Sequence, residues 1–165
     1  MSTKKLSKKA DKLLDAYRKK NIKLATAESC TGGLLSTMLT DVPGSSDVFD
    51  RGFVTYSNQA KMDMLGVEAS LIAKHGAVSK EVAEAMARGA IARSKADIAI
   101  AVTGVAGPTG GTKKKPVGLV YIAAASRHYK DAVVVENHFK GNRASIRAKS
   151  ADKSLTILKR LQAFF

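Results

Sequence analysis

The stretch D-I-A-I-A-V-T, residues 97–103, decides the fold of this chain. It is nearly continuously apolar, which is typical of a central strand whose two faces are both covered. Shorter runs with strand character occur at residues 22–27 and 50–56. Two further β-rich runs, 117–125 and 132–139, are joined by a short polar link and predict an antiparallel hairpin.

Helical patterns separate the first strands and follow the last one. Residues 3–20 place apolar side chains at helical spacing between lysines. Further helices are predicted from Thr31-Gly32-Gly33 to about Leu39, from Ser57 or Asn58 to near Gly66, from Ser79 to about Lys95, and over 143–162. This alternation predicts a single α/β domain over residues 1–165, with three layers, α/β/α, around a mixed, mostly parallel sheet.

The net charge of +14 is concentrated in the two terminal segments. Residues 1–23 carry nine Lys or Arg and two Asp, a net of +7, and residues 140–165 carry seven Lys or Arg and one Asp, a net of +6. The 116 residues between them hold the remaining +1. Because both terminal segments are predicted helices, solvated basic helix faces are the simpler interpretation, and a polyanion-binding surface is the alternative.

Composition argues against several classes of protein. The sequence has no apolar run of the roughly 20 residues that cross a membrane, and its basic N-terminus lacks the apolar core of a signal peptide. A single cysteine cannot form an internal disulfide. The three histidines show no metal-ligand spacing, so no metal is expected. We therefore expect a cytoplasmic protein with no membrane partner.

Chemistry-bearing residues gather where the predicted strands end, which is where open α/β sheets bind ligands. The first such joint is A-E-S-C-T-G-G, residues 27–33, in which hydroxyls and paired glycines precede a helix. Exposed N–H groups there can hold a phosphate, or the oxyanion of an acyl-transfer transition state with Ser29 as nucleophile. A helix N-cap with close packing explains the same local pattern equally well.

The second joint is T-Y-S-N-Q-A-K, residues 55–61. If Tyr56 ends a strand and Lys61 lies about one turn into the next helix, both side chains can point at one cleft. Desolvation lowers the pKa of a lysine, which then serves as a general base, and Ser–Lys pairs are a known alternative to Ser–His–Asp. Taken alone, a helix lysine such as Lys61 is more commonly solvated.

The third joint is T-G-V-A-G-P-T-G-G, residues 103–111. Its glycines can take positive φ and wrap a ligand as an anion nest, although it has neither a P-loop ending nor a Rossmann spacing. Arg143, which follows Gly141-Asn142 at the start of the last helix, is a candidate phosphate partner. Cys30 has no histidine near it in sequence and is interpreted as a small buried thiol.

Together these joints resemble the C-terminal domain of the competence/damage-inducible CinA proteins, the nicotinamide-nucleotide amidase family. The matching stretches are A-E-S-C-T-G-G, G-S-S-D-V-F-D-R-G-F-V-T-Y-S-N-Q-A-K, H-G-A-V-S, T-G-V-A-G-P-T-G-G and K-P-V-G-L-V, with a weaker match at F-K-G-N-R. The resemblance covers roughly residues 8–162 and implies the stand-alone form of this domain.

The resemblance implies hydrolytic deamidation of nicotinamide mononucleotide to nicotinic acid mononucleotide and ammonia, in pyridine-nucleotide recycling. Carried over by motif, Ser29 is the nucleophile, Lys61 its base and Tyr56 a supporting hydroxyl. The residues implied to line the nucleotide pocket are Thr31, Gly32, Gly33, Thr103, Gly104, Gly107 and Arg143. No metal or organic cofactor is implied.

The expected ligand is thus a small nucleotide, and a homo-oligomer, most simply a dimer, is expected. Two alternatives stay open: an amidase for another small amide, and a non-catalytic paralogue that binds a nucleotide or a nucleic acid. A nucleic-acid partner is not favoured, because the sequence lacks stacking aromatics and any recognised DNA- or RNA-binding motif.

Overall fold

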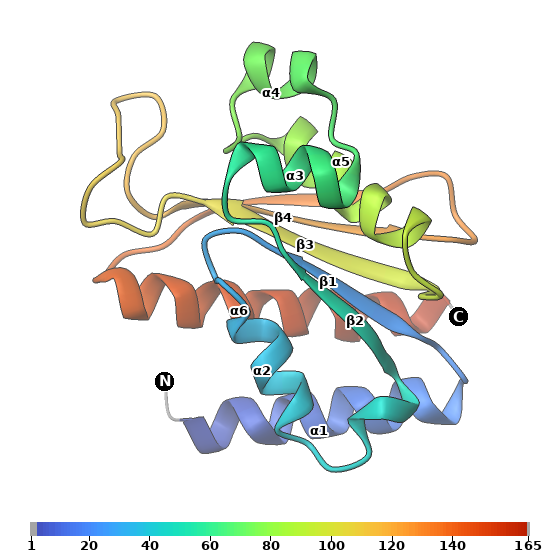
Figure 1. Cartoon of the computed structure of the whole chain (residues 1–165). Coiled ribbons are helices and arrows are strands. Elements are labelled where there is room, and N and C mark those ends of the chain that lie inside the picture. Colours follow the sequence, from blue (N-terminus) through green and yellow to red (C-terminus); the bar gives the residue numbers. More distant parts are fainter. Residues whose placement is uncertain (1–2, 165) are drawn as a thin grey trace.

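A computed structural model of the chain describes residues 3–164; Met1, Ser2 and Phe165 of the predicted domain lie outside the described residues. In this described part, a sheet of five strands forms the middle layer, in the order β2-β1-β3-β4-β5 (Figure 1). The strands are β1 (Leu24–Glu28), β2 (Phe49–Val54), β3 (Ile98–Gly104), β4 (Leu119–Ser126) and β5 (Val133–His138).

The sheet is mixed, and most of its strands share one direction, as predicted. The neighbours β2, β1 and β3 run parallel, while β4 and β5 form the predicted antiparallel hairpin. Because β5 is antiparallel to β4, it runs in the direction of the first three strands. The strand β3, which the sequence predicts as central, pairs with β1 on one side and with β4 on the other.

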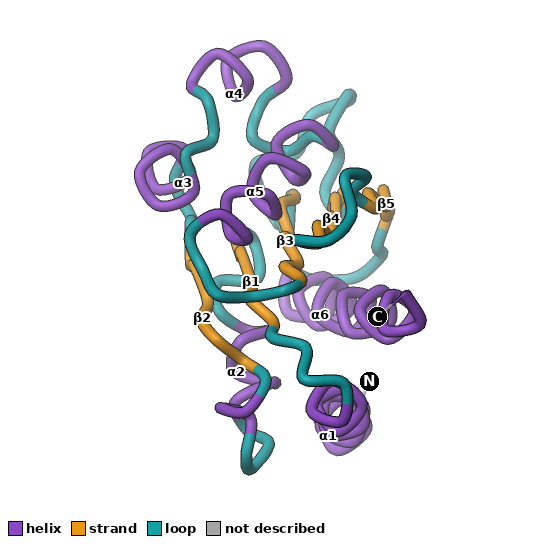
Figure 2. Tube along the Cα trace, turned by 90° about the vertical axis from the view of Figure 1, so that its right-hand side faces the viewer, coloured by secondary structure: helices purple, strands orange, loops and turns teal. Residues whose placement is uncertain are grey.

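Helices cover both faces of the sheet and complete the predicted three layers (Figures 1 and 2). One outer layer consists of α1 (Thr3–Lys19), α2 (Leu34–Thr40) and α6 (Arg143–Leu161). The other consists of α3 (Asn58–Leu65), α4 (Ala69–His75) and α5 (Lys80–Ala92). Among residues 3–164, no helix has the length and apolar character needed to cross a membrane.

Three details of the helices differ from the sequence prediction. The helix α4 was not predicted, because its seven residues are too few to display a helical period. The helix α2 begins at Leu34, since residues 31–33 form a turn in which Gly33 has a positive φ of 92°. The helix α5 ends at Ala92, about three residues earlier than predicted.

Side-chain size differs between the two faces of β3. The side chains of Ile98, Ile100 and Val102 belong to the core against α1, α2 and α6, whereas Ala99 and Ala101 belong to the core against α5. Successive residues of a strand point to opposite faces, so large side chains separate β3 from one helical layer and small side chains let the other layer lie closer. The helix α5 meets the small face with small residues of its own: Ala83, Ala87 and Ala90.

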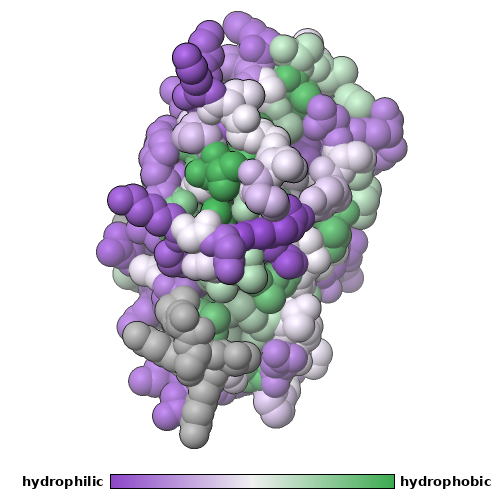
Figure 3. Space-filling model, turned by 90° about the vertical axis from the view of Figure 1, so that its left-hand side faces the viewer, coloured by the Kyte–Doolittle hydropathy of each residue, from purple (hydrophilic) through white to green (hydrophobic). Residues whose placement is uncertain are grey.

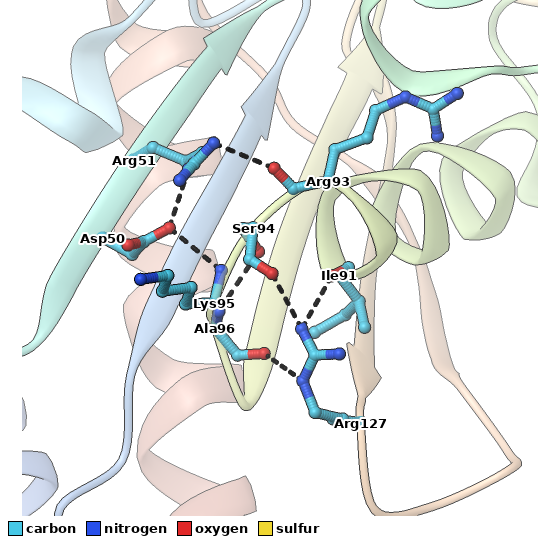
Figure 4. A network of polar contacts seen from close by, with 8 residues as sticks. All are labelled: Asp50, Arg51, Ile91, Arg93, Ser94, Lys95, Ala96 and Arg127. Carbon is cyan, nitrogen blue, oxygen red and sulfur yellow. Dashed lines mark hydrogen bonds and ion pairs between the residues drawn. The ribbon is translucent and has the colours of Figure 1, made fainter.

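A network of polar contacts surrounds the segment that leads into β3 at its amino end (Figure 4). Arg127, which follows β4, donates hydrogen bonds to the Ile91 carbonyl oxygen in the last turn of α5 and to the Ser94 and Ala96 carbonyl oxygens of the turn before β3. Arg51 of β2 donates to the Arg93 carbonyl oxygen of the same turn. These contacts hold the segment through which the chain enters β3.

The contact between α3 and α5 predicts the effect of one substitution. A Cβ atom at Gly89 of α5 would meet the Leu65 carbonyl oxygen of α3. In an exposed helix, Gly→Ala stabilises by about 1 kcal/mol. At this position we expect the reverse, a loss of about 1–3 kcal/mol in the free energy of unfolding from overpacking, measured by urea denaturation.

The matched control is Ala92→Gly at the exposed last residue of α5. It changes only helix propensity, so we expect a loss of no more than about 1 kcal/mol. A Gly89→Ala protein at least as stable as the wild type would contradict the close approach of α3 to α5.

Candidate active site

Segments far apart in the sequence converge at the carboxyl edge of β1, β2 and β3, which lies at the left of Figure 1. They surround a cavity of about 360 Å³. The sequence-predicted site residues that line this cavity are Ser29, Tyr56, Lys61, Thr103, Gly104, Gly107 and Arg143. Figure 3 looks onto this edge of the molecule, where hydrophilic side chains surround separate hydrophobic patches.

Strand geometry sends the neighbours Glu28 and Ser29 to opposite faces of the sheet. The carboxylate of Glu28 contacts the first turn of α2, whereas the hydroxyl of Ser29 contacts Lys61 of α3 on the other face. This separation follows from the two-residue period of a strand. One residue therefore anchors a helix while the next one faces the cavity.

Lys61 is the most unusual side chain of the cavity, because its amine is buried. The residue is 1% exposed, and its Nζ lies 3.1 Å from Ser29 Oγ. The same Nζ lies 2.9 Å from the carbonyl oxygen of Thr55 and 3.3 Å from that of Tyr56. These carbonyl oxygens accept hydrogen bonds from the amine and hold it beside the serine.

Burial lowers the pKa of Lys61 from its ordinary value, because the charged ammonium loses the solvation it has in water. The neutral amine still donates N–H bonds to backbone carbonyl oxygens, and its lone pair can then face Ser29 Oγ. A base placed 3.1 Å from a hydroxyl is within reach of its proton. The pair thus has the geometry of a nucleophile with its base.

Tyr56 and Arg143 form a contact at the rim of the same cavity. The side chain of Tyr56 is 61% exposed, and its hydroxyl accepts a hydrogen bond from Arg143 Nη2 at 2.9 Å. Arg143 Nη1 donates to the Gly107 carbonyl oxygen, also at 2.9 Å. In this arrangement the Tyr56 hydroxyl is paired with Arg143, and it is the Tyr56 carbonyl oxygen that contacts Lys61.

Cys30 also lines the cavity but is a poor nucleophile. The residue is 6% exposed, and burial raises the pKa of its thiol to about 11. A thiol with that pKa is protonated near neutral pH, and the thiolate is the reactive form. Among residues 3–164, no group of three or more His, Cys, Asp or Glu residues is arranged to hold a metal ion.

The paired glycines of the first joint lie outside the cavity, contrary to the sequence prediction. Thr31, Gly32 and Gly33 are not among its lining residues. The Gly32 N–H donates to the Ser29 carbonyl oxygen, and the Gly33 N–H donates to a carboxylate oxygen of Glu28. The N–H groups of both glycines are therefore engaged inside the turn.

Sequence reasoning missed the part that Glu28 plays in this site. Its carboxylate is fully buried and accepts hydrogen bonds from the N–H groups of Gly33, Leu35 and Ser36 and from the Ser36 hydroxyl. These donors include the first orphan N–H groups of α2, whose helix dipole also favours a negative charge. The sequence signal for this contact was an acidic residue directly after a predicted strand, a few residues before paired glycines and a predicted helix.

Other lining residues were also missed, most of which come from turns and loops. The hydroxyl of Thr103 donates to the Ala77 carbonyl oxygen at 2.8 Å and ties the turn after α4 to the end of β3. Ala77 and Val78 of that turn line the cavity. Asn58 of α3 and Val105, Ala106, Thr109 and Gly110 of the loop after β3 also line it. The motif H-G-A-V-S contained the only sequence signal for the turn.

The two basic terminal helices lie side by side on one face of the sheet (Figure 2). Part of their charge is used inside the protein. Lys9 of α1 binds the Asp152 carboxylate of α6 at 2.5 Å, and Lys20 donates to the Gln162 carbonyl oxygen. These contacts join the two ends of the chain, so solvation is not the only role of the terminal cations.

The chain is a three-layer α/β domain in which a buried lysine contacts Ser29 at the carboxyl edge of the parallel strands. The chain belongs to the CinA C-terminal domain family, whose sequence model matches residues 6–162. It is 49% identical over 148 residues to a putative competence-damage inducible protein of Caldicellulosiruptor saccharolyticus, covering 90% of this chain and 36% of the relative.

Further comparisons agree. The chain is 53% identical over 145 residues to a CinA-like protein of Desulfotalea psychrophila, covering 88% of this chain and 35% of the relative. It thus spans about a third of the length of these curated relatives.

A crystal structure of the competence/damage inducible protein CihA from Agrobacterium tumefaciens has a TM-score of 0.92 at 43% identity, covering 94% of each chain. A CinA superfamily protein from Klebsiella pneumoniae has a TM-score of 0.93 at 32% identity, covering all of both chains.

The contacts of Glu28 predict a large effect for a small change. In Glu28→Gln an NH₂ group replaces one acceptor oxygen and faces N–H donors of α2. Because buried donors then lose their acceptor, we expect the free energy of unfolding to fall by about 3 kcal/mol, measured by urea denaturation.

The matched control is Glu68→Gln, an exposed carboxylate that makes no side-chain cap hydrogen bond at α4. Its expected effect is within about 0.5 kcal/mol. Equal stabilities of the two variants would show that the Glu28 charge does not hold the turn.

Proposed function

We propose that this protein hydrolyses the carboxamide of nicotinamide mononucleotide to the carboxylate, releasing ammonia. The observation that carries this proposal is the 3.1 Å contact between Ser29 Oγ and the buried amine of Lys61 at the wall of an open cavity. Hydrolysis of an amide needs a nucleophile and a group that moves protons, and this pair supplies both.

The first half of the proposed reaction transfers the acyl group to the protein. Ser29 Oγ attacks the carboxamide carbon while its proton moves to the lone pair of Lys61 Nζ. The C–N bond then breaks, and Lys61 returns the proton to the leaving nitrogen, which departs as ammonia. The product of this half is an ester between Ser29 and the nicotinoyl group.

The second half removes the acyl group with water. Lys61 takes a proton from the water as its oxygen adds to the ester carbon. The bond from that carbon to Ser29 Oγ breaks, and Lys61 gives the proton back to Ser29. The acid leaves, and both residues return to their starting states, so one water is consumed for each ammonia released.

The amidase proposal predicts the kinetics of two variants. Ser29→Ala removes the nucleophile and should abolish ammonia release from nicotinamide mononucleotide. Lys61→Met fills the same buried space without a base, and we expect kcat to fall by about 100-fold or more. Ammonia release measured with a coupled assay checks both values.

Matched controls come from α4, away from the cavity. Ser70→Ala and Lys74→Met change exposed residues of the same types and should keep wild-type rates. Full activity of Ser29→Ala would overturn the serine mechanism. If the wild type releases ammonia from another small amide but not from the mononucleotide, the substrate assignment is wrong while the mechanism stands.

The lowered pKa of Lys61 predicts a pH profile. Only the neutral amine can accept the Ser29 proton, so the rate is full above the pKa of Lys61 and is lost as pH falls through it. Because burial lowers this pKa from the ordinary value of 10.5, the acidic limb of kcat/KM should be centred below 10.5. A limb centred at or above 10.5, measured by ammonia release across pH, would contradict Lys61 as the base.

A further inference from the structure

Arg147 of α6 contacts the turn that carries Ser29, from the face of the sheet opposite Lys61. Its Nη2 donates to the Thr31 carbonyl oxygen at 2.7 Å, although the two residues are 116 positions apart in the sequence. The same oxygen accepts the Leu34 N–H at 3.2 Å, so it has one donor from its own turn and one from α6. Neither Arg147 nor Thr31 lines the cavity, so the guanidinium acts on the turn and not on a ligand.

Arg147 differs in this from Arg143, the other arginine of the same helix. The two are four residues apart and therefore project from the same side of α6. Arg143 donates to the Gly107 carbonyl oxygen of the loop after β3, whereas Arg147 donates to the turn after β1. The cavity accounts for Arg143 but not for Arg147, whose contact lies behind the turn.

Packing does not explain the guanidinium of Arg147. Within residues 3–164, its Nε is buried and has no hydrogen-bond partner, and the same holds for Oγ1 of Thr31, a fully buried residue. Unpaired polar atoms in the interior cost free energy, which an apolar side chain at position 147 would avoid. The arginine therefore needs another reason, and its contact with the turn of Ser29 supplies one.

The charge of Arg147 has the sign opposite to that of Glu28 at this turn. Burial is the main cause of the raised pKa of the Cys30 thiol; the Glu28 carboxylate raises this pKa further, and the Arg147 guanidinium lowers it. Ser29 lies between Glu28 and Cys30 in the chain. When Ser29 Oγ attacks a carbonyl group, negative charge develops on the carbonyl oxygen beside it. A buried carboxylate opposes this charge, and a nearby guanidinium favours it.

We propose that Arg147 is a positioning residue for Ser29: its guanidinium fixes the turn 29–33 from the side of α6 and offsets the charge of Glu28 there. Glu28 holds the same turn from the side of α2, so the turn lies between two charged anchors of opposite sign. This inference rests on the proposed function only for the part of Ser29 as nucleophile. The hold on the turn depends on no substrate.

Amide hydrogen exchange tests the hold on the turn without any reaction. The N–H groups of Gly32 and Leu34 donate to the carbonyl oxygens of Ser29 and Thr31. In Arg147→Met, both amides should exchange faster than in the wild type by about tenfold, because the turn opens more readily. The amide of Ile100, buried in β3, should keep its wild-type rate. Unchanged exchange in the turn, or an equal increase at Ile100, would overturn the proposal.

Two further variants are matched to this change. Arg147→Lys keeps a cation with N–H donors and should bring exchange at Leu34 back to within about threefold of the wild type. Lys149→Met removes a cation of the same helix that also donates to a backbone carbonyl oxygen, that of Lys140, away from the cavity. It should change exchange in the turn by no more than about twofold. If Lys149→Met accelerates this exchange as much as Arg147→Met does, any loss of charge from α6 has the same effect and the proposal is wrong.

The reactivity of Ser29 tests the consequence for the nucleophile. A fluorophosphonate forms an O–P bond with Ser29 Oγ while fluoride leaves and the serine proton passes through Lys61 to the solvent; mass spectrometry follows the labelling. The rate should fall by about tenfold or more in Arg147→Met and stay within about twofold of the wild type in Lys149→Met. Equal rates in Arg147→Met and the wild type would contradict the positioning role. A wild type that is not labelled at Ser29 would contradict the serine mechanism, and exchange in the turn would still decide the part of Arg147.

Kinetics separate this inference from the amidase proposal. In Arg147→Met, kcat for nicotinamide mononucleotide should fall by about tenfold or more while KM stays within about twofold, because Arg147 does not line the cavity. A raised KM with unchanged kcat would make Arg147 a binding residue and overturn its positioning role. Faster exchange of the turn in Arg147→Met, but no ammonia release from the mononucleotide by the wild type, would sink the amidase proposal and leave the positioning role standing.

Discussion

The buried carboxylate of Glu28 is the contact on which the site depends. A charge with no exposure to water is costly unless hydrogen bonds replace its solvation, and here four donors from the first turns of α2 do so. The contact joins the end of β1 to the start of α2, so the turn between them has one conformation. Ser29 is the first residue of that turn, and its position beside Lys61 follows from this anchor.

The two faces of the sheet differ in side-chain size, and the polar side chains of the cavity lie on the face with small residues. Large aliphatic residues fill the core against α1, α2 and α6, whereas alanines let α5 lie close to the opposite face. Ser29, directly after β1, and Thr103, within β3, both project toward this second face, because each has the same parity as the alanines of its strand that face α5. The polar network around Arg127 lies at the amino end of β3, and Ser29 and Lys61 lie at the carboxyl end of the parallel strands, where a cavity opens.

Burial shifts the pKa values of the two titratable side chains beside Ser29 in opposite directions. It lowers the pKa of Lys61, which makes the amine a usable base, and raises the pKa of Cys30, which keeps the thiol protonated. The same physical cause therefore favours Ser29 over its neighbour as nucleophile. At the rim, Arg143 and Tyr56 are exposed, so the cavity has a buried end at Ser29 and Lys61 and a solvated end at Arg143 and Tyr56.

The sequence by itself determined the three layers and the central position of β3, because apolar periodicity is a local signal. It also identified Ser29, Lys61 and Arg143 as candidates, because the glycine-rich joints near them are local signals too. From the sequence alone, Gly32 and Gly33 could equally form the turn before a helix or bind a ligand through their N–H groups. Only the tertiary structure decided between them, since the N–H groups of Gly33, Leu35 and Ser36 at the start of α2 donate to the buried Glu28 carboxylate. Hydrogen-bond partners of this kind are set by strand pairing and helix packing, which no local pattern records.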